Sequence, residues 1–456
     1  MNPRETALDF VAKAAAVEAT DPQTAYRLLA SACMQDPTYA DGWFKFGNAC
    51  FLQGLFPAAV AAFRRALDIV PGNIHVLNRL GHTLYHVGEL DEAGRRMREV
   101  LEQDPQNVHA LCNLSMVQSI LGTPDESLKL AIDAYACMRS AGENDPAIEL
   151  QLAFAYLYAR RWQAGLKHFR VRFPYAMKRF ENSPYPAWSG EDLKGKRLFV
   201  LQEMGLGDAL SFLRFVPMAA AHAQSVELQV NPELVRVAAL ALRNHANVSV
   251  APLTQEFPAA DYWCSLGDLP TAMYLSDGEI ETAPAPEVPY TSIAATVPWK
   301  VRGQKLHIGI AWAGNPGNMI DRWRSTTIEQ FLELQKVPGV QLYSLQVGER
   351  ANDLYAAGCV GLVRDLAPYI RDVADTCAIL RDLDLVITVE SALRHIAGML
   401  GVDCWVPLAR NGGDWRCGRQ GDSPLWDVHT RLWRQGEDAA WPPVFRGMAA
   451  ALKERV

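Results

Sequence analysis

Two glycines and a carboxylate stand together in residues 201–215, LQEMGLGDALSFLRF. The apolar run before them predicts the end of a strand, and Gly205-Leu206-Gly207 predicts a tight turn. Asp208 then opens a helix. Glycines let a backbone pass close to a bound molecule, and a carboxylate at that point can take a proton from an attacking hydroxyl. The alternative is that Asp208 is only a helix N-cap, a position at which aspartate is among the best residues.

The turn fits neither of two common nucleotide-binding motifs. A dinucleotide fingerprint needs Gly-x-Gly-x-x-Gly, but Leu210 takes the place of the third glycine. The next strand ends in Val230-Asn231 rather than in an acid that could bind a ribose. A P-loop needs Gly-Lys-Ser/Thr, which does not follow. We therefore expect a cleft at the carboxyl ends of parallel strands, where open α/β sheets bind ligands.

A second group of candidates surrounds another predicted strand end. Glu390, Ser391 and Ala392 end a very apolar strand and open a helix, and backbone N–H groups at such a helix start form a ready anion site. The Ser391 hydroxyl can add a hydrogen bond to a phosphate. His395, one turn further on, is expected to be a packed, hydrogen-bonded histidine beside the site rather than a catalytic one.

Polar groups also follow another strand and another turn. Gln346 and Glu349 stand at the end of a predicted strand, where either can contact a ribose or a base. Asp414 follows the Gly412-Gly413 turn and, with the two residues after it, is expected to close the cleft.

The elements that must position these residues are short apolar strands that alternate with helices. Such alternation predicts parallel sheets joined by crossover helices. The proline-rich stretch 281–290 divides the strands into two series, so we predict two doubly wound domains that face each other across a cleft. The predicted strands span residues 197–202, 226–230, 248–252, 306–314, 341–346, 385–389 and 404–408.

The N-terminal third carries an internal repeat. Pro37, Pro71 and Pro105 are 34 residues apart, and each closes an apolar helical pattern. Small residues recur where two helices would cross closely, with glycine at 47 and 81 and alanine at 59 and 93. This spacing resembles the tetratricopeptide repeat, with weaker units expected at 6–39 and 152–169. The repeats either grip a peptide or protein in a concave groove or only brace or dimerise the chain.

Composition limits the partners and the compartment. The formal net charge of −7 argues against a nucleic-acid backbone as the main partner, because such binding needs clustered cations. The nine cysteines are scattered without a C-x-x-C pair, so we expect reduced, mostly buried thiols and no metal site. No stretch fits a secretory signal or approaches the roughly 20 apolar residues that span a bilayer, and a cytoplasmic protein is expected.

From about residue 184 onward, the sequence resembles the family 9, heptosyltransferase-like glycosyltransferases, especially those fused to tetratricopeptide repeats. The glycine turn before Asp208 and the helix start at Ser391 are two of the segments that carry the resemblance. The full set comprises residues 186–190, 203–208, 311–316, 321–325, 344–346, 375–376, 389–392, 395–398 and 414–416.

The resemblance implies an all-α tetratricopeptide-repeat solenoid followed by a GT-B fold of two Rossmann-like α/β domains. It implies an inverting, metal-independent transfer of a sugar from a nucleotide-diphosphate sugar, with no cofactor besides this donor substrate. The acceptor belongs on the first domain, with Asp208 as base, and the donor on the second. The expected parts are a repeat domain 1–173, a connector 174–195, an acceptor domain 196–300 and a donor domain 301–456.

The resemblance also implies donor contacts. Arg322 and Arg324 are placed near the pyrophosphate, with Asn315 in the loop before them; the alternative is a pair of solvated surface arginines. GT-B enzymes stabilise the departing diphosphate with helix N-termini and basic side chains in place of Mg²⁺. The chain departs from the family at Glu390-Ser391, where the family usually has Asp-Thr, and this departure leaves the identity of the sugar open.

Three functions stay open at this point. The first is a glycosyltransferase whose repeats recruit a protein acceptor, such as a surface appendage or secreted protein, before export. The second is a heptosyltransferase-like enzyme that modifies a lipopolysaccharide core. The third is a non-catalytic repeat scaffold with a decayed sugar-nucleotide site. A homo-oligomer is compatible with all three.

Overall fold

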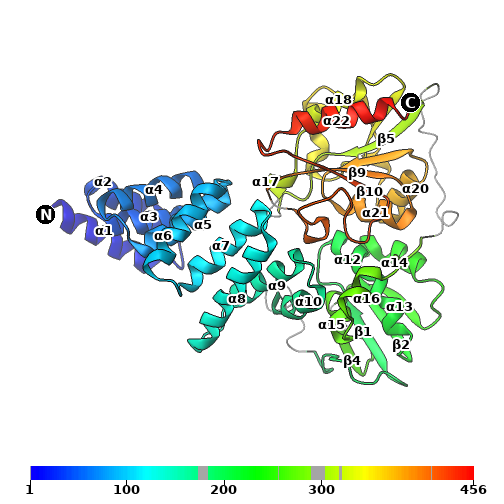
Figure 1. Ribbon diagram of the computed structural model, residues 1–456, viewed down its shortest axis with the longest axis horizontal. Helices are drawn as coiled ribbons and strands as arrows, with labels where there is room; N and C mark the ends of the chain where they lie inside the picture. The colour runs from blue at the N-terminus through cyan, green and yellow to red at the C-terminus, as the bar shows by residue number, and fades with distance from the viewer. Residues whose placement is uncertain are drawn as a thin grey trace. The chain divides into compact units, whose positions relative to one another are not determined.

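The computed structural model describes residues 2–172, 183–254, 256–288, 303, 305–317, 321–411 and 413–456 (Figure 1). They fall into two units, Met1–Ala155 and Tyr156–Val456. The first unit is helical, and the second contains two parallel β-sheets with crossover helices. This arrangement confirms the predicted fold class of a helical repeat solenoid followed by α/β domains.

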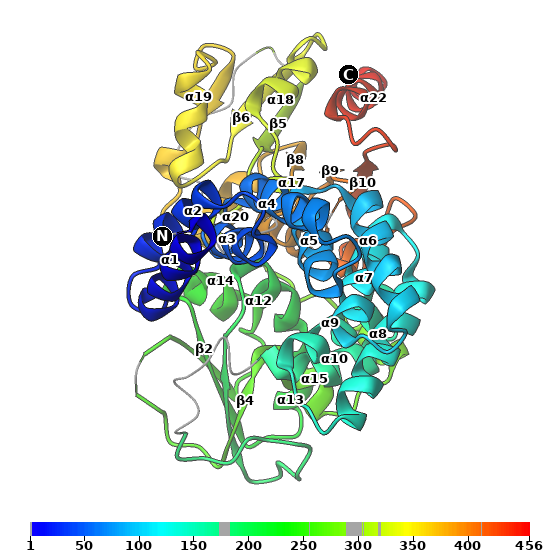
Figure 2. The ribbon, with the colours of Figure 1, turned by 90° about the vertical axis from the view of Figure 1, so that its left-hand side faces the viewer.

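Successive helices of the first unit stack pair upon pair (Figure 2). Asparagine side chains start two of the helices: Asn73 accepts the backbone N–H groups of residues 75 and 76, and Asn107 accepts that of Ala110. Left-handed glycines end the same helices, with φ of 88° at Gly88 and 89° at Gly122. The helices are α1 (Pro3–Val17), α2 (Pro22–Gln35), α3 (Ala40–Leu52), α4 (Phe56–Ile69), α5 (Ile74–Val87), α6 (Leu90–Gln103), α7 (Val108–Leu121), α8 (Pro124–Ser140) and α9 (Pro146–Tyr158).

The small residues of the repeat lie where the helices of a pair touch. A Cβ atom at Gly47 would lie 2.6 Å from the Phe63 ring, and one at Gly81 would lie 2.2 Å from Cε of Met97. Ala59 and Ala93 are completely buried. The close helix crossings predicted from the 34-residue spacing are thereby confirmed.

A partly buried histidine in α5 makes the stability of the repeat unit depend on pH. The His82 ring lies 5.2 Å from Phe51 and 4.8 Å from His86, centroid to centroid. Burial, followed by the nearby charges of Arg79 and His109, lowers the pKa of His82 to about 4. The folded state therefore excludes a proton that the unfolded chain binds below about pH 6.5.

We expect His82 to contribute a free energy of unfolding that is fully present above pH 6.5. This contribution is lost as the pH falls towards 4. The full loss is about 3 kcal/mol, because each pKa unit corresponds to about 1.4 kcal/mol. The measurement is thermal unfolding of the helical signal at pH 7.5 and pH 4.5 for the wild type and His82→Phe, in which the loss should shrink. His75→Phe, at an exposed position of the same helix, is the control. An undiminished loss in His82→Phe contradicts this assignment.

The first sheet of the second unit is parallel, with strand order β3-β2-β1-β4. Its strands are β1 (Arg197–Leu201), β2 (Ser225–Val230), β3 (Val248–Pro252) and β4 (Tyr262–Ser265). The helices around it are α10 (Trp162–Phe169), α12 (Leu206–Phe212), α13 (Val216–Ala220), α14 (Val235–Ala241), α15 (Leu269–Ala272) and α16 (Asp277–Thr282).

The second sheet is also parallel, with strand order β10-β9-β8-β5-β6-β7. Counted from its own first strand, this is the 3-2-1-4-5-6 order of nucleotide-binding doubly wound domains. The strand order reverses between β5 and β8, which are neighbours in the sheet. Ligands bind at such switch points, outside the carboxyl ends of the strands.

Buried Ile308, Ile310, Leu342 and Ile387 form the core of this domain beneath α18 and α22. The strands are β5 (Leu306–Ala311), β6 (Val340–Ser344), β7 (Val363–Asp365), β8 (Leu385–Thr388), β9 (Cys404–Leu408) and β10 (Thr430–Arg434). The helices are α17 (Asp321–Arg324), α18 (Ile328–Gln335), α19 (Asp353–Ala356), α20 (Val373–Leu380), α21 (Ala392–Leu400) and α22 (Trp441–Lys453).

The predicted connector is partly built into the first sheet. The backbone N–H of Trp188 donates to Trp263 O at 2.8 Å, and Ala187 bridges the same residue of β4. Trp188 itself is buried. Residues 173–182 of the connector region and the predicted boundary at 300/301 lie outside the described residues.

Candidate functional site

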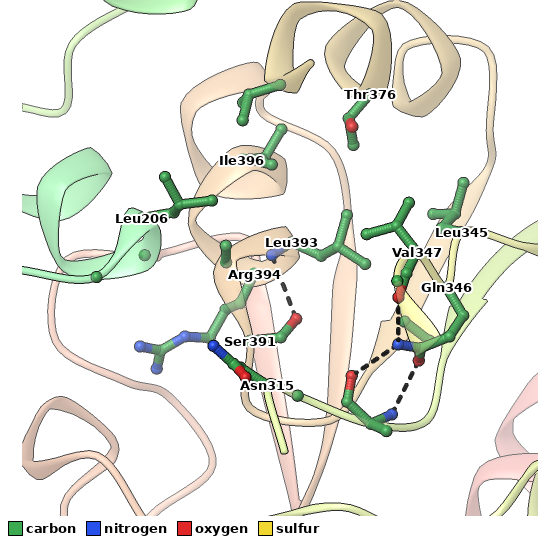
Figure 3. Close-up of a pocket in the computed structure, with 18 of the residues that line it drawn as sticks. Leu206, Asn315, Leu345, Gln346, Val347, Thr376, Ser391, Leu393, Arg394 and Ile396 are labelled. Atoms are coloured by element: carbon green, nitrogen blue, oxygen red, sulfur yellow. Dashed lines mark hydrogen bonds between the residues drawn. The ribbon is translucent and has the colours of Figure 1, made fainter. Parts of the chain in front are cut away.

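A cavity of about 810 Å³ opens between the carboxyl ends of the two sheets, within the Tyr156–Val456 unit (Figure 3). Leu206 at the start of α12 lies beside α21, and both line the cavity. The cavity brings together residues predicted from both halves of the sequence. These are Gly205, Leu206, Gly207, Asp208, Asn315, Arg324, Gln346, Glu349, Glu390, Ser391, Ala392, His395 and Asp414. The side chain of Arg322 lies outside the described residues.

Asp208 lies in the first turn of α12, but it does not cap the helix. The capping position belongs to Gly205, so the N-cap interpretation of Asp208 is wrong. The Asp208 side chain is 44% exposed, and Nη2 of Arg416 donates to its Oδ1 at 2.8 Å. A half-exposed carboxylate at the edge of the cavity is therefore held in place by a guanidinium from the other domain.

Arg416 is itself fixed by buried charges. Its side chain is only 3% exposed, and its Nη1 donates to Oδ2 of Asp414 at 2.6 Å. Nη2 of Arg394 donates to the same oxygen at 3.0 Å. Burial alone would raise the pKa of Asp414, but the two guanidiniums hold it well below its usual value. Asp414 thus stays ionised and links Arg394 to the residue that holds Asp208.

Glu390 belongs to the same group of charged side chains as Asp414. Its Oε1 accepts the backbone N–H of Asp414, while Oε2 has no hydrogen-bond partner among the described residues. Burial, followed by the nearby charge of Asp414, raises the pKa of Glu390. A buried carboxyl oxygen without a partner at the cavity wall is a group that a ligand can satisfy.

His395 joins the two α/β domains. Its Nδ1 lies 2.9 Å from Oγ of Ser211 in α12 and 3.1 Å from Oδ2 of Asp427. Its Nε2 lies 3.0 Å from Nη2 of Arg394. Burial and then Arg394 lower the pKa of His395, so the ring is neutral at pH 7. This is the packed, hydrogen-bonded histidine expected from the sequence.

The same three side chain types form the relay of serine hydrolases, but the geometry here differs. In that relay the serine and the aspartate use different ring nitrogens. Here Ser211 and Asp427 both approach Nδ1 of His395, and Ser211 is buried. The group therefore positions α12 against α21 and does not activate a nucleophile.

The two domains approach each other closely at Gly207. A Cβ atom there would lie 3.2 Å from Cδ2 of His395 and 3.4 Å from Cα of Ala392. Neither neighbour can move easily. His395 is hydrogen-bonded on both ring nitrogens, and the Cα of Ala392 belongs to the backbone at the start of α21. The glycine that the sequence suggested for passing close to a ligand passes close to the other domain.

We expect Gly207→Ala to destabilise the Tyr156–Val456 unit by about 1–3 kcal/mol, the usual cost of overpacking. Gly205→Ala is the matched control, since a Cβ there meets only Oδ2 of Asp208 at 3.7 Å. Thermal unfolding of both variants is the measurement. Equal midpoints for the two variants would show that the contact at Gly207 is not tight.

At the start of α21, the Ser391 hydroxyl is occupied by the protein. Its oxygen accepts the backbone N–H of Leu393 at 3.3 Å and lies 2.9 Å from Oγ1 of Thr388 (Figure 3). Ser391 is thus the N-cap of the helix. It positions the backbone N–H groups of the helix start beside the cavity, next to Ala392.

The predicted ribose contacts differ in what they can offer. The amide of Gln346 is used by the backbone: Oε1 accepts the N–H groups of Trp312 and Ala313 at 3.0 Å each, and Nε2 donates to Ala313 O at 3.1 Å (Figure 3). Gln346 therefore ties the loops after β5 and β6 together. Glu349 is exposed at the cavity rim and keeps its carboxylate available there.

Arg324 is oriented by an acid in its own helix. Its Nε donates to Oδ1 of Asp321 at 3.0 Å, and its side chain is 17% exposed. Gly314 leaves it room, because a Cβ there would lie 2.4 Å from Nη2 of Arg324. Asn315, exposed in the same loop, accepts the N–H of Gly317 at 2.9 Å.

The loop that carries Asp414 and Arg416 is braced from outside the α/β domains. The Tyr158 hydroxyl donates to Gly413 O, and Trp162 of α10 lies 5.3 Å from Trp415, centroid to centroid. The last predicted repeat helix therefore belongs to the structure that holds the cavity.

Sequence reasoning missed several lining residues. Arg350, Arg371 and Arg394 line the cavity, as do Glu233 and Asp372. Arg394 lies inside the motif around His395, so its position was a usable signal. The others are charged residues in surface-like loops, and no pattern distinguishes them.

The described residues form neither a metal-ion cluster nor a disulfide. They contain no group of three or more His, Cys, Asp and Glu side chains placed to hold a metal ion. None of the nine cysteines is in a disulfide. Within the described part of the chain, the helices are all too short or too polar to cross a bilayer.

Comparison with known proteins identifies the repeats. Two family models, each described as tetratricopeptide repeat, match residues 14–74 and 51–114. Protein FlbA of Caulobacter vibrioides is 26% identical over 434 residues, which covers 87% of this chain and 70% of FlbA.

Solved structures of repeat proteins are similar to part of the chain. A thermophilic tetratricopeptide-repeat protein of Thermus thermophilus is 17% identical, with a TM-score of 0.32, over 37% of this chain and 92% of that one. MamA of Desulfovibrio magneticus is 16% identical, with a TM-score of 0.33, over 39% of this chain and 98% of that one. TM-scores this low carry no information about function.

Proposed function

We propose that this protein is an inverting, metal-independent glycosyltransferase that moves a sugar from a nucleotide-diphosphate sugar to a hydroxyl acceptor. One observation carries the proposal: a half-exposed carboxylate, Asp208, stands on one wall of a cavity whose other wall has a helix start and Arg324. The cavity of about 810 Å³ falls in the size range of small-molecule sites.

The residues divide the work of transfer between the walls. Asp208 takes the proton from the acceptor hydroxyl as its oxygen bonds to the anomeric carbon. The bond to the diphosphate breaks on the opposite face, and the leaving group departs with the electron pair. The start of α21 and the arginines of the second domain stabilise its negative charge.

The tetratricopeptide repeats indicate a protein-interaction scaffold. In the proposal they recruit the protein or peptide that carries the acceptor hydroxyl. A membrane-bound saccharide gives no comparable reason for a peptide-binding solenoid. The lipopolysaccharide-core alternative is therefore less well supported.

A non-catalytic scaffold is the second candidate, and specific contacts favour it. The Ser391 hydroxyl and the Gln346 amide are both occupied by the protein. A decayed donor site would show such internal satisfaction. The unpartnered Oε2 of Glu390 speaks for a site that still binds a ligand.

Calorimetric titration with a panel of UDP-, GDP-, ADP- and dTDP-sugars tests the proposal. We expect one donor to bind, and we expect Arg324→Gln to weaken that binding about tenfold or more, since it removes a charged contact to phosphate. Arg431→Gln, at an exposed position of β10, is the control. Absence of binding by every donor in the panel would favour the scaffold. Mass spectrometry of acceptors incubated with the bound donor then identifies the sugar and the acceptor together.

A further inference from the structure

The charges that line the cavity are divided unevenly between its walls. From the first α/β domain, the lining residues are those of the turn from Gly205 to Asp208, and Glu233. Among the described residues, that wall therefore presents two carboxylates and no lysine, arginine or histidine. All lining arginines come from the second domain: Arg324, Arg350, Arg371 and Arg394.

Among the described residues, no lysine, arginine or histidine of the first domain lines the cavity, and we call this first-domain wall the acceptor wall. Arg416 pairs with Asp208 and offsets part of its charge, but its side chain is only 3% exposed and is not among the lining residues. Glu233 is exposed and forms no ion pair within the described part of the chain. Arg236, three residues further on, is committed to the second domain, where its Nη1 lies 2.7 Å from Oδ2 of Asp372 and 3.4 Å from Oδ1 of Asp375.

The cavity wall also has a buried polar atom that is typical of a ligand site. Glu390 is 5% exposed and lines the cavity, and its Oε2 is unpartnered among the described residues. The second wall has four arginines beside its acids, so it can hold an anionic donor. The lining residues of the acceptor wall offer an anion no basic side chain, and their two carboxylates repel it.

Coulomb's law sets the size of this selectivity. A unit charge on the acceptor, about 4 Å from Glu233, changes the affinity for that acceptor about fivefold when water screens the pair. The change is larger in a closed cleft. A phosphate or carboxylate on the acceptor would meet both Asp208 and Glu233. An ammonium or guanidinium group would be attracted to them.

We infer that the acceptor hydroxyl is a serine or threonine hydroxyl in a peptide whose neighbouring side chains are uncharged or cationic. A phosphorylated or carboxylated saccharide is disfavoured by the same wall. This inference rests on the proposed function and specifies its acceptor. In the transfer, the hydroxyl oxygen bonds to the anomeric carbon, its proton passes to Asp208, and the nucleoside diphosphate leaves.

The test uses the full-length protein with a donor that calorimetry has shown to bind. The acceptors are a peptide pool with a central Ser or Thr and randomised flanks, and a phosphorylated inner-core oligosaccharide of lipopolysaccharide. Mass spectrometry reads the flanking composition of the products. We expect Lys and Arg to be enriched and Asp and Glu to be depleted about fivefold near the modified residue.

Charge reversal at Glu233 separates this inference from the proposed function. Glu233→Lys should abolish or invert the preference, whereas Glu256→Lys, exposed on the same domain outside the cavity, should leave it unchanged. Preferred transfer to the phosphorylated saccharide, acidic enrichment, rejection of the whole peptide pool, or a preference that ignores Glu233 would each overturn the inference. In these outcomes the donor still binds, so the failure concerns the acceptor and not the donor site. Failure to bind any donor overturns both.

Discussion

Replacing Asp208 with asparagine is expected to lower kcat for sugar transfer by about 10²–10⁴-fold, the usual contribution of a positioned general base. Asparagine keeps the size of the side chain and an oxygen that can accept from Nη2 of Arg416, which lies 2.8 Å from Oδ1 in the native protein. It cannot take the proton of an acceptor hydroxyl. Donor affinity, measured by calorimetry, should stay unchanged because the donor is expected on the opposite wall.

Asp261→Asn is the matched control for this experiment. Asp261 lies in the same domain and also pairs with an arginine, with its Oδ2 3.3 Å from Nε of Arg197, but it is not part of the cavity. Transfer at the wild-type rate is expected for this variant. If Asp208→Asn also keeps wild-type turnover, Asp208 is not the base. If both variants lose turnover together, the loss reflects folding rather than chemistry.

Replacing Arg394 with methionine is expected to lower the free energy of unfolding of the Tyr156–Val456 unit by about 3–5 kcal/mol. The arginine side chain is 1% exposed, its Nη2 lies 3.0 Å from Oδ2 of Asp414, and its Nε lies 3.4 Å from Oδ2 of Asp427. Methionine fills most of the volume but leaves Asp427, which is buried, and Asp414, which is 15% exposed, without that cation. Their desolvation is then offset less fully, because among the described residues Asp414 keeps only Arg416 and Asp427 keeps only His395.

Tryptophan fluorescence during denaturant unfolding measures this effect in the full chain. Of the twelve tryptophans, Trp43 alone belongs to the repeat unit, so the signal reports the α/β unit. Arg455→Met is the control, because Nη2 of Arg455 lies 2.7 Å from Oδ2 of Asp403 in an ion pair that is 35% and 48% exposed. An exposed pair is worth at most about 1 kcal/mol. Similar losses in the two variants would contradict the buried-network assignment.

Local patterns predicted the elements well, with clear exceptions. The strands with continuous apolar runs, such as β1 and β8, were found from the sequence because burial on both faces leaves that signature. The strands β4, β7 and β10 were missed. Two of them are only three or four residues long, and β10 carries Arg431 and Arg434, which look like surface residues.

The candidate site shows the same division. Asp208, Glu390 and Ser391 were located because each follows an apolar strand, and the carboxyl ends of parallel strands meet at one edge. What these side chains contact could not be read from the pattern. The sequence suggested a phosphate contact for Ser391 and a ribose contact for Gln346, and both side chains hydrogen-bond to the protein.

The sequence by itself determined the 34-residue helical repeat, the alternation of strands and helices, and the strand ends at which polar residues gather. These features depend on neighbours within a few turns of the chain, and periodicity records them. Only the tertiary structure decided that Arg416 holds Asp208, 208 residues away, and that Ser211 meets His395, 184 residues away. Such pairs form only when crossover connections bring distant loops to the same sheet edge, and a linear pattern carries no record of that distance.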